Sequence, residues 1–440
     1  MDICVPEKVA YIIKKLEQEG HEAYIVGGCV RDALLKREPE DWDITTSASP
    51  FQVKKIFRRT IDTGIQHGTV TVMLEKDGFE VTTYRIDGAY EDGRHPSSVQ
   101  FTSNLKEDLK RRDFTINAMA YNPKTGIVDL FGGQDDLKAG IIRCVGNAAE
   151  RFTEDALRIL RAIRFASQLG FQIEEQTQQG IRTLASNLSK VSQERIQVEM
   201  TKLLVSPHPE QLRIAYELGV TAVILPELDA IMPLKQNNPY HCYTVGNHTI
   251  AMVEQIRATK VLRWTALLHD IGKLQTHKID ENGQDHFYGH AEKSAVQAKQ
   301  ILRRFKFDND TIDKVSRLIL YHAYHLRRDK KIIRRCMNKI GVDLFEDLLE
   351  VMRADTMAKS NYQQQEWLED IIEIKKLYEE IVADHECITL KQLDVNGQDL
   401  IQIGILPGKQ MGELLNKMLD YVLEHPEANR KEVLLDKFCS

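Results

Sequence analysis

Two carboxylates, Asp41 and Asp43, stand two residues apart in the strand-like run Glu40-Asp-Trp-Asp-Ile-Thr-Thr46. Alternate residues of a strand point to the same side, so this spacing places both carboxylates on one face. Neighbouring carboxylates repel each other unless a cation lies between them, and Mg²⁺ takes carboxylate and phosphate oxygens together. The pair therefore predicts metal-assisted chemistry on a nucleoside triphosphate.

A turn suited to phosphate precedes this pair. Residues 23–26 form a β-like run that stops at Gly27 and Gly28, and a helix carrying Arg31 is predicted over residues 30–36. Backbone N–H groups and a helix start converge at such a turn and favour an anion. Neither signal is specific alone, since Gly-Gly turns and solvated Asp-x-Asp turns are both common.

Together, the Gly-Gly-x-Val-Arg-Asp run at residues 27–32 and Asp41-Trp-Asp43 resemble the signature of the nucleotidyltransferase superfamily that includes DNA polymerase β. The closer resemblance is to its branch of class II tRNA nucleotidyltransferases and bacterial poly(A) polymerases. It implies a polymerase-β-like head at the N-terminus and Mg²⁺ bound by the two aspartates as catalytic residues. It also implies a triphosphate held by Gly27, Gly28 and Arg31.

A β-hairpin with a third acidic residue follows. Residues 68–74 and 79–85 are rich in strand-forming residues and flank the turn Glu75-Lys-Asp-Gly78. Glu80 on the second strand is a candidate third catalytic carboxylate, and a solvent-facing strand residue is an equal alternative. Residues 87–101, with glycines, charges and no periodicity, predict a loop. In the resembled family a flexible loop at this place helps the enzyme accept ATP after CTP.

The run Lys110-Arg-Arg-Asp-Phe-Thr-Ile-Asn-Ala-Met-Ala120 predicts an apolar helix opened by charged residues. Arg112 could be a surface charge, and Asp113 could simply favour the helix dipole. Alternatively, a guanidinium holds phosphate oxygens while a carboxylate takes a ribose hydroxyl. The resemblance favours this second interpretation and implies that Arg112, Asp113 and the buried-looking Asn117 bind the nucleotide.

Asp155, Arg158 and Arg161 recur every three residues in a helix predicted over residues 154–165. An exposed helix with ion pairs would give the same pattern. However, cytosine and adenine each present an amino donor beside a ring-nitrogen acceptor, whereas uracil and guanine present the reverse. A carboxylate beside a guanidinium therefore fits C and A and misfits U and G. The resemblance supports base selection here, since the family's template for the incoming base is an Asp and an Arg in this motif.

A second constellation begins after residue 240, where histidines and acids gather. Its candidate metal ligands are His248, His269, Asp270, His290, His322 and Asp355. Imidazoles and carboxylates suit Mn, Fe, Ni, Co or Zn, and the adjacent His-Asp pair offers a nitrogen and a bridging carboxylate at one point.

The ordered set His248, His269-Asp270 and Asp355 resembles the signature of HD-domain phosphohydrolases. His290 and His322 resemble the additional ligands of the two-metal members of that group. His325 is an alternative to His322, and the remaining histidines of the segment fit ordinary core or surface positions. The resemblance implies a transition metal, with Mn, Ni, Co and Fe as candidates, and a phosphohydrolase activity.

Composition limits the class of protein. The chain has 440 residues and a net charge of −6, so any RNA contact must come from local patches, with Arg327-Arg-Asp-Lys-Lys-Ile-Ile-Arg-Arg335 as the most basic run. The same run would also fit a solvated helix face. The seven scattered cysteines predict free thiols. With no signal peptide and no long apolar run, we expect a cytoplasmic protein that does not span a membrane.

These observations predict an α+β fold, in which a head with a small mixed sheet is followed by a helical neck, an HD body and a tail. The expected boundaries are 1–143 for the head, 144–205 for the base-recognising neck, 206–239 for a linker, 240–360 for the HD domain and 361–440 for a tRNA-contacting tail. Glu194 and Arg195, in a further family motif of the neck, are expected to brace a neighbouring helix.

The predicted function is addition of CCA to the 3′ end of tRNA from CTP and ATP, with no protein partner evident. Three alternatives remain from the sequence: A-only addition, poly(A) polymerase activity, and an HD phosphohydrolase with a degenerate head.

Overall fold

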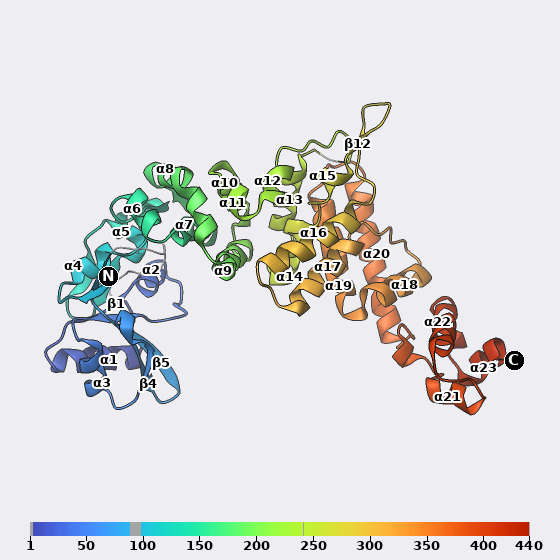
Figure 1. The fold of residues 1–440 in the computed structure, drawn as a ribbon, viewed down its shortest axis with the longest axis horizontal. Helices are drawn as coiled ribbons and strands as arrows, with labels where there is room; N and C mark the ends of the chain where they lie inside the picture. Colours follow the sequence, from blue (N-terminus) through green and yellow to red (C-terminus); the bar gives the residue numbers. More distant parts are fainter. Residues whose placement is uncertain (1–2, 89–97, 241, 440) are drawn as a thin grey trace. The chain divides into compact units, whose positions relative to one another are not determined.

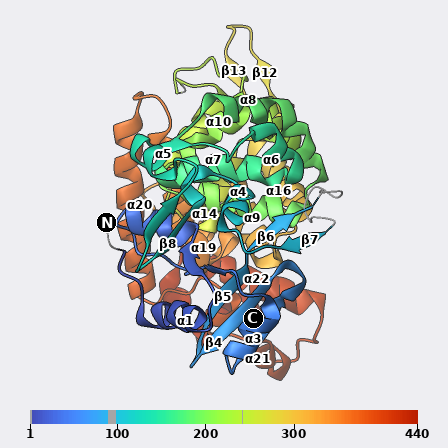
Figure 2. The same ribbon diagram turned by 90° about the vertical axis from the view of Figure 1, so that its left-hand side faces the viewer.

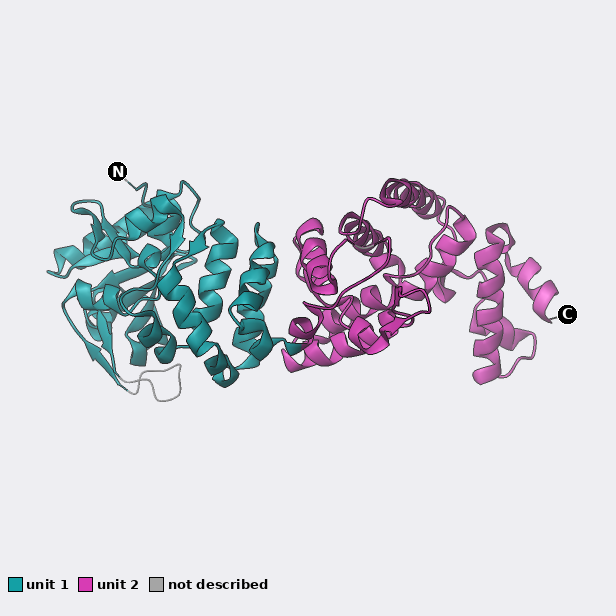
Figure 3. Cartoon of the chain, turned by 90° about the horizontal axis from the view of Figure 1, so that it is seen from above, with its two compact units in different colours: residues 1–226 teal, residues 227–440 magenta. Residues whose placement is uncertain are grey.

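The computed structural model describes residues 3–88, 98–240 and 242–439. The loop expected to help in accepting ATP falls largely on residues 89–97 and so lies outside the described residues. The chain divides into two compact units, Met1–Pro226 and Glu227–Ser440 (Figure 3). Among the helices of the described residues, none has the length and apolar character needed to cross a membrane.

A seven-stranded mixed sheet forms the centre of the first unit (Figures 1 and 2). In spatial order its strands are β3 (Thr60–Gly64), β4 (Thr69–Leu74), β5 (Asp77–Thr83), β2 (Ile44–Thr46), β1 (Ala23–Val26), β8 (Met119–Asn122) and β9 (Gly126–Asp129). Within this sheet only the β2–β5 pair is parallel. The predicted hairpin is β4–β5, and the predicted small mixed sheet is confirmed. A separate two-stranded ribbon joins β6 (Arg85–Asp87) and β7 (Val99–Phe101).

Short helices accompany the sheet, namely α1 (Glu7–Gln18), α2 (Gly28–Leu34), α3 (Pro50–Ile56), α4 (Leu105–Lys110) and α5 (Gly133–Ala139). Helix α1 shows how the pattern works, because Val9, Ile12, Ile13 and Leu16 recur on one face and are all buried. That face packs on β1 and β2. A capping box of Ser49 and Gln52, with proline at the first turn, starts α3.

Two local predictions in the head were wrong. Asp41 and Asp43 lie just before β2 and not within a strand, although the N–H of Val26 donates to the carbonyl of Asp43 and keeps the chain extended there. The run after Arg112 does not form a helix. It makes one 3₁₀ turn at Thr115–Asn117 and then enters the sheet as β8, because pairing with both β1 and β9 outweighs local helix preference.

The neck consists of α6 (Ala148–Glu154), α7 (Leu157–Leu169), α8 (Glu175–Leu184) and α9 (Gln193–Leu204). A short parallel pair, β10 (Ile141–Ile142) with β11 (Gln172–Ile173), interrupts these helices. The predicted single helix over residues 154–165 is wrong, since Asp155 ends α6 with extended backbone and α7 begins two residues later. Helices α10 (Leu212–Glu217) and α11 (Val220–Ile224) complete the unit.

The second unit is built on helices, with one small hairpin of β12 (Lys278–Ile279) and β13 (Asp285–His286). Its helices are α12 (Pro226–Ile231), α13 (Val245–Gln255), α14 (Lys260–Leu268), α15 (Lys273–Thr276), α16 (His290–Arg304), α17 (Asn309–Tyr321), α18 (Lys330–Ile340), α19 (Val342–Met357), α20 (Gln364–Ala383), α21 (Gly397–Gln402), α22 (Lys409–Glu424) and α23 (Lys431–Cys439). Helix α14 is buried from Leu262 to Leu268 and packs against α13, α16, α17 and α19. Trp264 on this helix contacts Phe305 and Phe307 in the core.

The basic run at residues 327–335 forms ion pairs and hydrogen bonds within this unit. Arg334 pairs with Glu386 at 2.7 Å and donates to the carbonyl of Leu423, while Lys331 and Arg335 both pair with Glu424. Its cations thus join α18 to the segments after α20 and at the end of α22. These contacts give the run a role within the unit, beside the tRNA contact considered from the sequence.

Candidate active site and metal centre

Three carboxylates meet at one end of the head sheet. Ile44 pairs with Val81 across the parallel strands β2 and β5, so Asp43 lies level with Glu80. Asp43 is accessible to solvent, but partial desolvation by the surrounding protein raises the pKa of its carboxyl group. The positive charge of Arg112 lowers this pKa, and the negative charge of Asp41 raises it further. Burial also raises the pKa of Glu80, followed by the charges of Asp43 and Asp41. Glu80 therefore faces the aspartate pair, which is the arrangement that a divalent cation would relieve.

The Gly-Gly turn brings arginine side chains to the same end of the sheet. Gly27 has φ +83°, and a Cβ at this position would lie 3.0 Å from Nη1 of Arg112. A side chain there would be strained and would push Arg112 away. Nε of Arg112 is buried and has no hydrogen-bond partner among the described residues. The guanidinium thus keeps donor capacity for a ligand.

A chain of hydrogen bonds joins the predicted phosphate and sugar residues. Nη1 of Arg31 donates to Oδ1 of Asn117 at 2.8 Å, and Nδ2 of Asn117 donates to Oδ1 of Asp113 at 3.2 Å. Two guanidinium nitrogens of Arg161 then reach Oδ2 of Asp113, at 2.8 and 2.6 Å. Burial alone would raise the pKa of Asp113, but Arg161 outweighs it and lowers the pKa to about 2. The carboxylate is therefore ionised and fixed in place.

Phe165 and Glu199, which were not singled out from the sequence, hold this network together. The guanidinium of Arg164 lies 3.8 Å from the centre of the Phe165 ring, and those of Arg31 and Arg161 lie 5.0 and 5.4 Å from it. Buried Glu199 on α9 accepts from Nε of Arg164 at 2.5 Å and lies 4.0 Å from Arg161. An aromatic face and a carboxylate thus allow three like charges to converge. The sequence contains one indication of Glu199, namely the spacing of Arg158, Arg161 and Arg164. Arginines so close together need a negative charge nearby, but their spacing does not show which residue supplies it.

The proposed base-reading pair is separated in this structure. Oδ2 of Asp155 accepts from Arg195 at 2.7 Å, which confirms that Arg195 braces the neighbouring helix. Arg158 instead pairs with Glu154 at 2.6 Å and donates to the carbonyl oxygen of Arg111. Asp155 and Arg158 consequently do not share a helix face, because the break between α6 and α7 lies between them.

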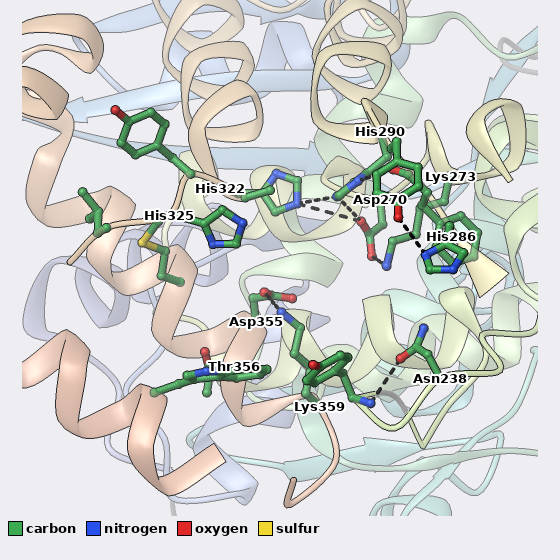
Figure 4. Close-up of a pocket in the computed structure, with 18 of the residues that line it drawn as sticks. Asn238, Asp270, Lys273, His286, His290, His322, His325, Asp355, Thr356 and Lys359 are labelled. Atoms are coloured by element: carbon green, nitrogen blue, oxygen red, sulfur yellow. Dashed lines mark hydrogen bonds and ion pairs between the residues drawn. The ribbon is translucent and has the colours of Figure 1, made fainter. Parts of the chain in front are cut away.

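All six predicted metal ligands of the second unit converge. His248 lies on α13, His269 and Asp270 follow α14, His290 opens α16, His322 ends α17 and Asp355 lies on α19. Two groups of three ligand atoms each fall within 4.8 Å of one another: His248, His269 and Asp270, and Asp270, His290 and His322. In Figure 4, dashed lines join His322 to Asp270 and His290, whereas His325 lies apart. The geometry thus selects His322 over His325.

The four histidines present the same ring nitrogen to the centre. Each Nδ1 lies 2.6–3.1 Å from a backbone carbonyl oxygen, which can only accept, so each Nδ1 carries a proton. Each neutral ring then has its lone pair on Nε2. The Nε2 atoms of His248 and His269 lie 3.2 Å apart, as do those of His290 and His322. Two lone pairs at that distance, as in the neutral pair His290 and His322, repel each other unless a cation lies between them.

Asp270 connects the two groups of ligands. Its Oδ2 lies 3.1 Å from Nε2 of His269, and its Oδ1 lies 3.5 Å from Nε2 of His290. That Oδ1 is buried and has no hydrogen-bond partner among the described residues. Burial opposes ionisation of Asp270, but His269 and Lys273 outweigh it and keep its pKa well below the usual range. A buried anionic oxygen without a donor, aimed at two imidazoles, fits a bridging metal ligand.

The protonation states of the imidazoles also suit a metal. Burial lowers the pKa of His248 and His290, and lowers that of His322 to about 3. His269 differs, because Asp270 and Asp355 outweigh the effect of burial and raise its pKa. At neutral pH three of the four rings are therefore already in the neutral form that binds metal.

Comparison with known proteins covers both units. Residues 23–143 match the family described as "Poly A polymerase head domain", and residues 286–438 match "tRNA nucleotidyltransferase domain 2". The CCA-adding enzyme of Ligilactobacillus salivarius is 36% identical over 431 residues, which is 98% of this chain and 95% of that protein. The CCA-adding enzyme of Enterococcus faecalis is 35% identical over 431 residues, with 98% and 94% covered.

Solved structures agree with this likeness. The crystal structure of the Bacillus stearothermophilus CCA-adding enzyme in complex with CTP is 32% identical, with a TM-score of 0.71 over 97% of this chain and 96% of that chain. The Thermotoga maritima CCA-adding enzyme complexed with tRNA has a TM-score of 0.59 at 21% identity, over 98% and 95% of the chains. The second of these likenesses concerns the fold alone.

The Asp113–Arg161 pair predicts a pH-dependent loss of stability on substitution. Because the folded pKa of Asp113 is about 2 and the ordinary value is 3.8, its ionisation stabilises the fold above pH 4, and this contribution disappears as pH falls through about 2. Asp113→Asn should therefore lower the free energy of unfolding of the first unit by roughly 2 kcal/mol at pH 7. Urea titrations at pH 7 and at pH 3 measure this.

The difference between Asp113→Asn and the unmodified protein should shrink at pH 3, and the exposed Asp135→Asn should change little at either pH. An equal difference at both pH values would show that the Asp113 charge is not the stabilising element.

Proposed function

The chain belongs to the CCA-adding enzymes, and we propose that its head transfers CMP and AMP to the 3′ end of tRNA at Asp41, Asp43 and Glu80. The observation that carries this assignment is the meeting of three mutually repelling carboxylates beside Arg112 and the Gly27 turn. These carboxylates would hold Mg²⁺, which when bound favours ionisation of the tRNA 3′-hydroxyl and offsets charge on the departing pyrophosphate.

The surrounding residues bind and orient the nucleotide. Arg31 and Arg112 bind the triphosphate, and Gly27 and Gly28 let the phosphates approach the backbone. Asp113 accepts from a ribose hydroxyl, while Arg161 and Asn117 keep its carboxylate ionised and correctly turned. The support for these roles is the series of hydrogen bonds from Arg31 through Asn117 and Asp113 to Arg161. It connects the residues proposed to bind the phosphates with those proposed to bind the sugar.

Base selection uses Asp155 and Arg158. Arg195 holds one oxygen of Asp155, so this carboxylate is already oriented to accept from the amino group of cytosine or adenine. Arg158 exchanges Glu154 for the ring nitrogen of the base when a nucleotide enters. CTP, ATP and tRNA are the substrates, and we place the reaction in the cytoplasm. The boundaries given above for head, neck, linker, HD domain and tail remain part of this proposal.

Loss of a head carboxylate should abolish transfer without unfolding the protein. Asp43→Asn or Glu80→Gln is expected to lower CMP transfer to a tRNA without CCA by about a thousandfold, because each removes a metal-holding charge. The melting temperature should be unchanged or slightly higher, since the substitutions relieve repulsion. Glu75→Gln, in the turn of the same hairpin, is the matched control and should transfer CMP normally. More than a trace of transfer by Asp43→Asn would refute the assignment.

Base selection predicts that Asp155→Ala changes the choice of nucleotide as well as the rate. The remaining guanidinium of Arg158 can donate to the carbonyl oxygens of uracil or guanine, so discrimination should fall by about 1–3 kcal/mol for the lost pairing group. The measurement is relative kcat/KM for CTP, ATP, UTP and GTP on one tRNA primer. Arg195→Ala is the control, since it removes the brace and leaves the acceptor. An unchanged selectivity ratio in Asp155→Ala would defeat the templating role.

We further propose that the second unit binds two transition-metal ions and hydrolyses a phosphate ester. His248, His269, Asp270 and Asp355 would hold one ion, and Asp270, His290 and His322 the other. Such ions, when bound, activate water and offset negative charge on phosphate oxygens. The support is the buried Oδ1 of Asp270 together with the paired Nε2 atoms at 3.2 Å.

Substitutions in the second unit should remove its phosphatase activity without affecting CCA addition by the head. His269→Ala and Asp270→Ala are expected to lose bound transition metal and phosphatase activity while CCA addition stays near the unmodified level, because the ligands lie in the other unit. Elemental analysis after expression with Mn, Ni and Co supplied gives the metal content. His325→Ala should keep its metal, since His325 is outside the ligand cluster. Absence of transition metal in the unmodified protein would refute the metal centre.

A further inference from the structure

Glu154, the last residue of helix α6, lies between two arginine side chains. Nη2 of Arg151 lies 2.5 Å from one of its carboxylate oxygens, Oε1, and Nη1 of Arg158 lies 2.6 Å from the other, Oε2. The side chains of both arginines are 12% exposed, and that of Glu154 is 23% exposed. A carboxylate with so little access to water is unfavourable without a positive charge beside it. Glu154 therefore needs at least one of the two guanidiniums.

The exchange proposed for Arg158 during base selection removes one of these two charges. When Arg158 turns to the ring nitrogen of the base, Oε2 of Glu154 loses its donor, while Arg151 stays on Oε1. Without Arg151, the release of Arg158 would leave the carboxylate with no cation, and the ion pair would hold Arg158 back. Arg151 thus determines how easily Arg158 leaves Glu154.

The guanidinium of Arg151 is fixed at one end and has an unused donor at the other. Its Nη1 donates to the carbonyl oxygen of Lys110, the last residue of α4, at 3.1 Å. Its Nε is buried and has no hydrogen-bond partner among the described residues. Nε and Nη2 lie on the edge of the guanidinium that a carboxylate takes in a bidentate pair. Once Arg158 leaves Oε2 of Glu154, Nε can donate to that oxygen, and Arg151 then holds both oxygens.

We propose that Arg151 is a positioning residue for base selection, which takes over Glu154 in a bidentate pair and so allows Arg158 to reach the incoming base. The inference rests on the proposed exchange of Arg158 and adds the residue that makes the exchange favourable. In this role Arg151 contacts Glu154 and not the nucleotide. Its hydrogen bond to Lys110 also connects the exchange to the head, because Lys110 stands two residues before Arg112.

Substitution of Arg151 tests this role through the KM for each nucleotide, measured with full-length protein and Mg²⁺. Arg151→Gln should raise KM about tenfold for CTP on tRNA without CCA and for ATP on tRNA ending in CC, because Arg158 then stays on Glu154. Arg151→Lys keeps the charge without the two-donor edge, so it should raise KM about threefold, and it provides the test if the glutamine variant does not fold. Arg182→Gln is the matched control, since Arg182 forms an exposed ion pair with Glu175 in the same unit.

A double substitution distinguishes this role from a merely structural one. When Glu154→Gln is added to Arg151→Gln, the neutral amide no longer retains Arg158, so KM should return to within about twofold of the value for Glu154→Gln alone. Losses that add up in the double variant, or an unchanged KM in both Arg151 variants, would overturn the proposal.

Arg158→Ala separates this failure from a failure of base selection. The ratio of kcat/KM for CTP to that for UTP should fall in Arg158→Ala, because the donor to the ring nitrogen is lost. An unchanged ratio would refute base selection by Arg158, and with it the exchange that Arg151 is proposed to assist. A lower ratio in Arg158→Ala with normal KM in Arg151→Gln would refute the role of Arg151 alone.

Discussion

Like charges held close together are the constraint on which both sites depend. In the head, burial raises the pKa of Asp43 and Glu80, and the nearby charge of Asp41 adds to both shifts. Beside them three guanidiniums gather around the single ring of Phe165, and Glu199 and Asp113 supply the opposing charge. Neither cluster is stable as a set of isolated charges. Fixed partners offset the charge of the guanidinium cluster, and a divalent cation with a triphosphate would offset the charge of the carboxylates and the remaining guanidinium charge.

The proposed metal centre of the second unit follows the same principle with lone pairs. The Nδ1–H of each of the four clustered histidines donates to a backbone carbonyl, which leaves the Nε2 atoms and the Oδ1 of Asp270 at the centre. Helix α14 makes this possible, because its buried position in the core fixes the His269-Asp270 pair at its end. Packing of Trp264 against Phe305 and Phe307 therefore contributes to ligand geometry as well as to stability.

Short motifs predicted the nucleotidyltransferase chemistry of the chain, and long-range contacts decided the rest. The Gly27 turn, the Asp41–Asp43 pair and the six candidate metal ligands could be found from residue types and spacing, as could the α+β class and the β4–β5 hairpin. The face taken by Glu80 could not, because it depends on the parallel pairing of Ile44 with Val81. Nor could the helix break after Asp155, where Arg195 from another helix holds the carboxylate. Glu199 gave no signal for the same reason, since its partner Arg164 lies 35 residues earlier.

We propose that the head carboxylates form the divalent-cation site of nucleotide transfer. Anomalous diffraction from crystals grown with Mn²⁺ and a non-hydrolysable CTP analogue tests it most directly. Mn²⁺ should lie within coordination distance of Asp41 and Asp43, with the α-phosphate of the analogue as a further ligand. A bound analogue with no Mn²⁺ peak between these carboxylates would contradict it.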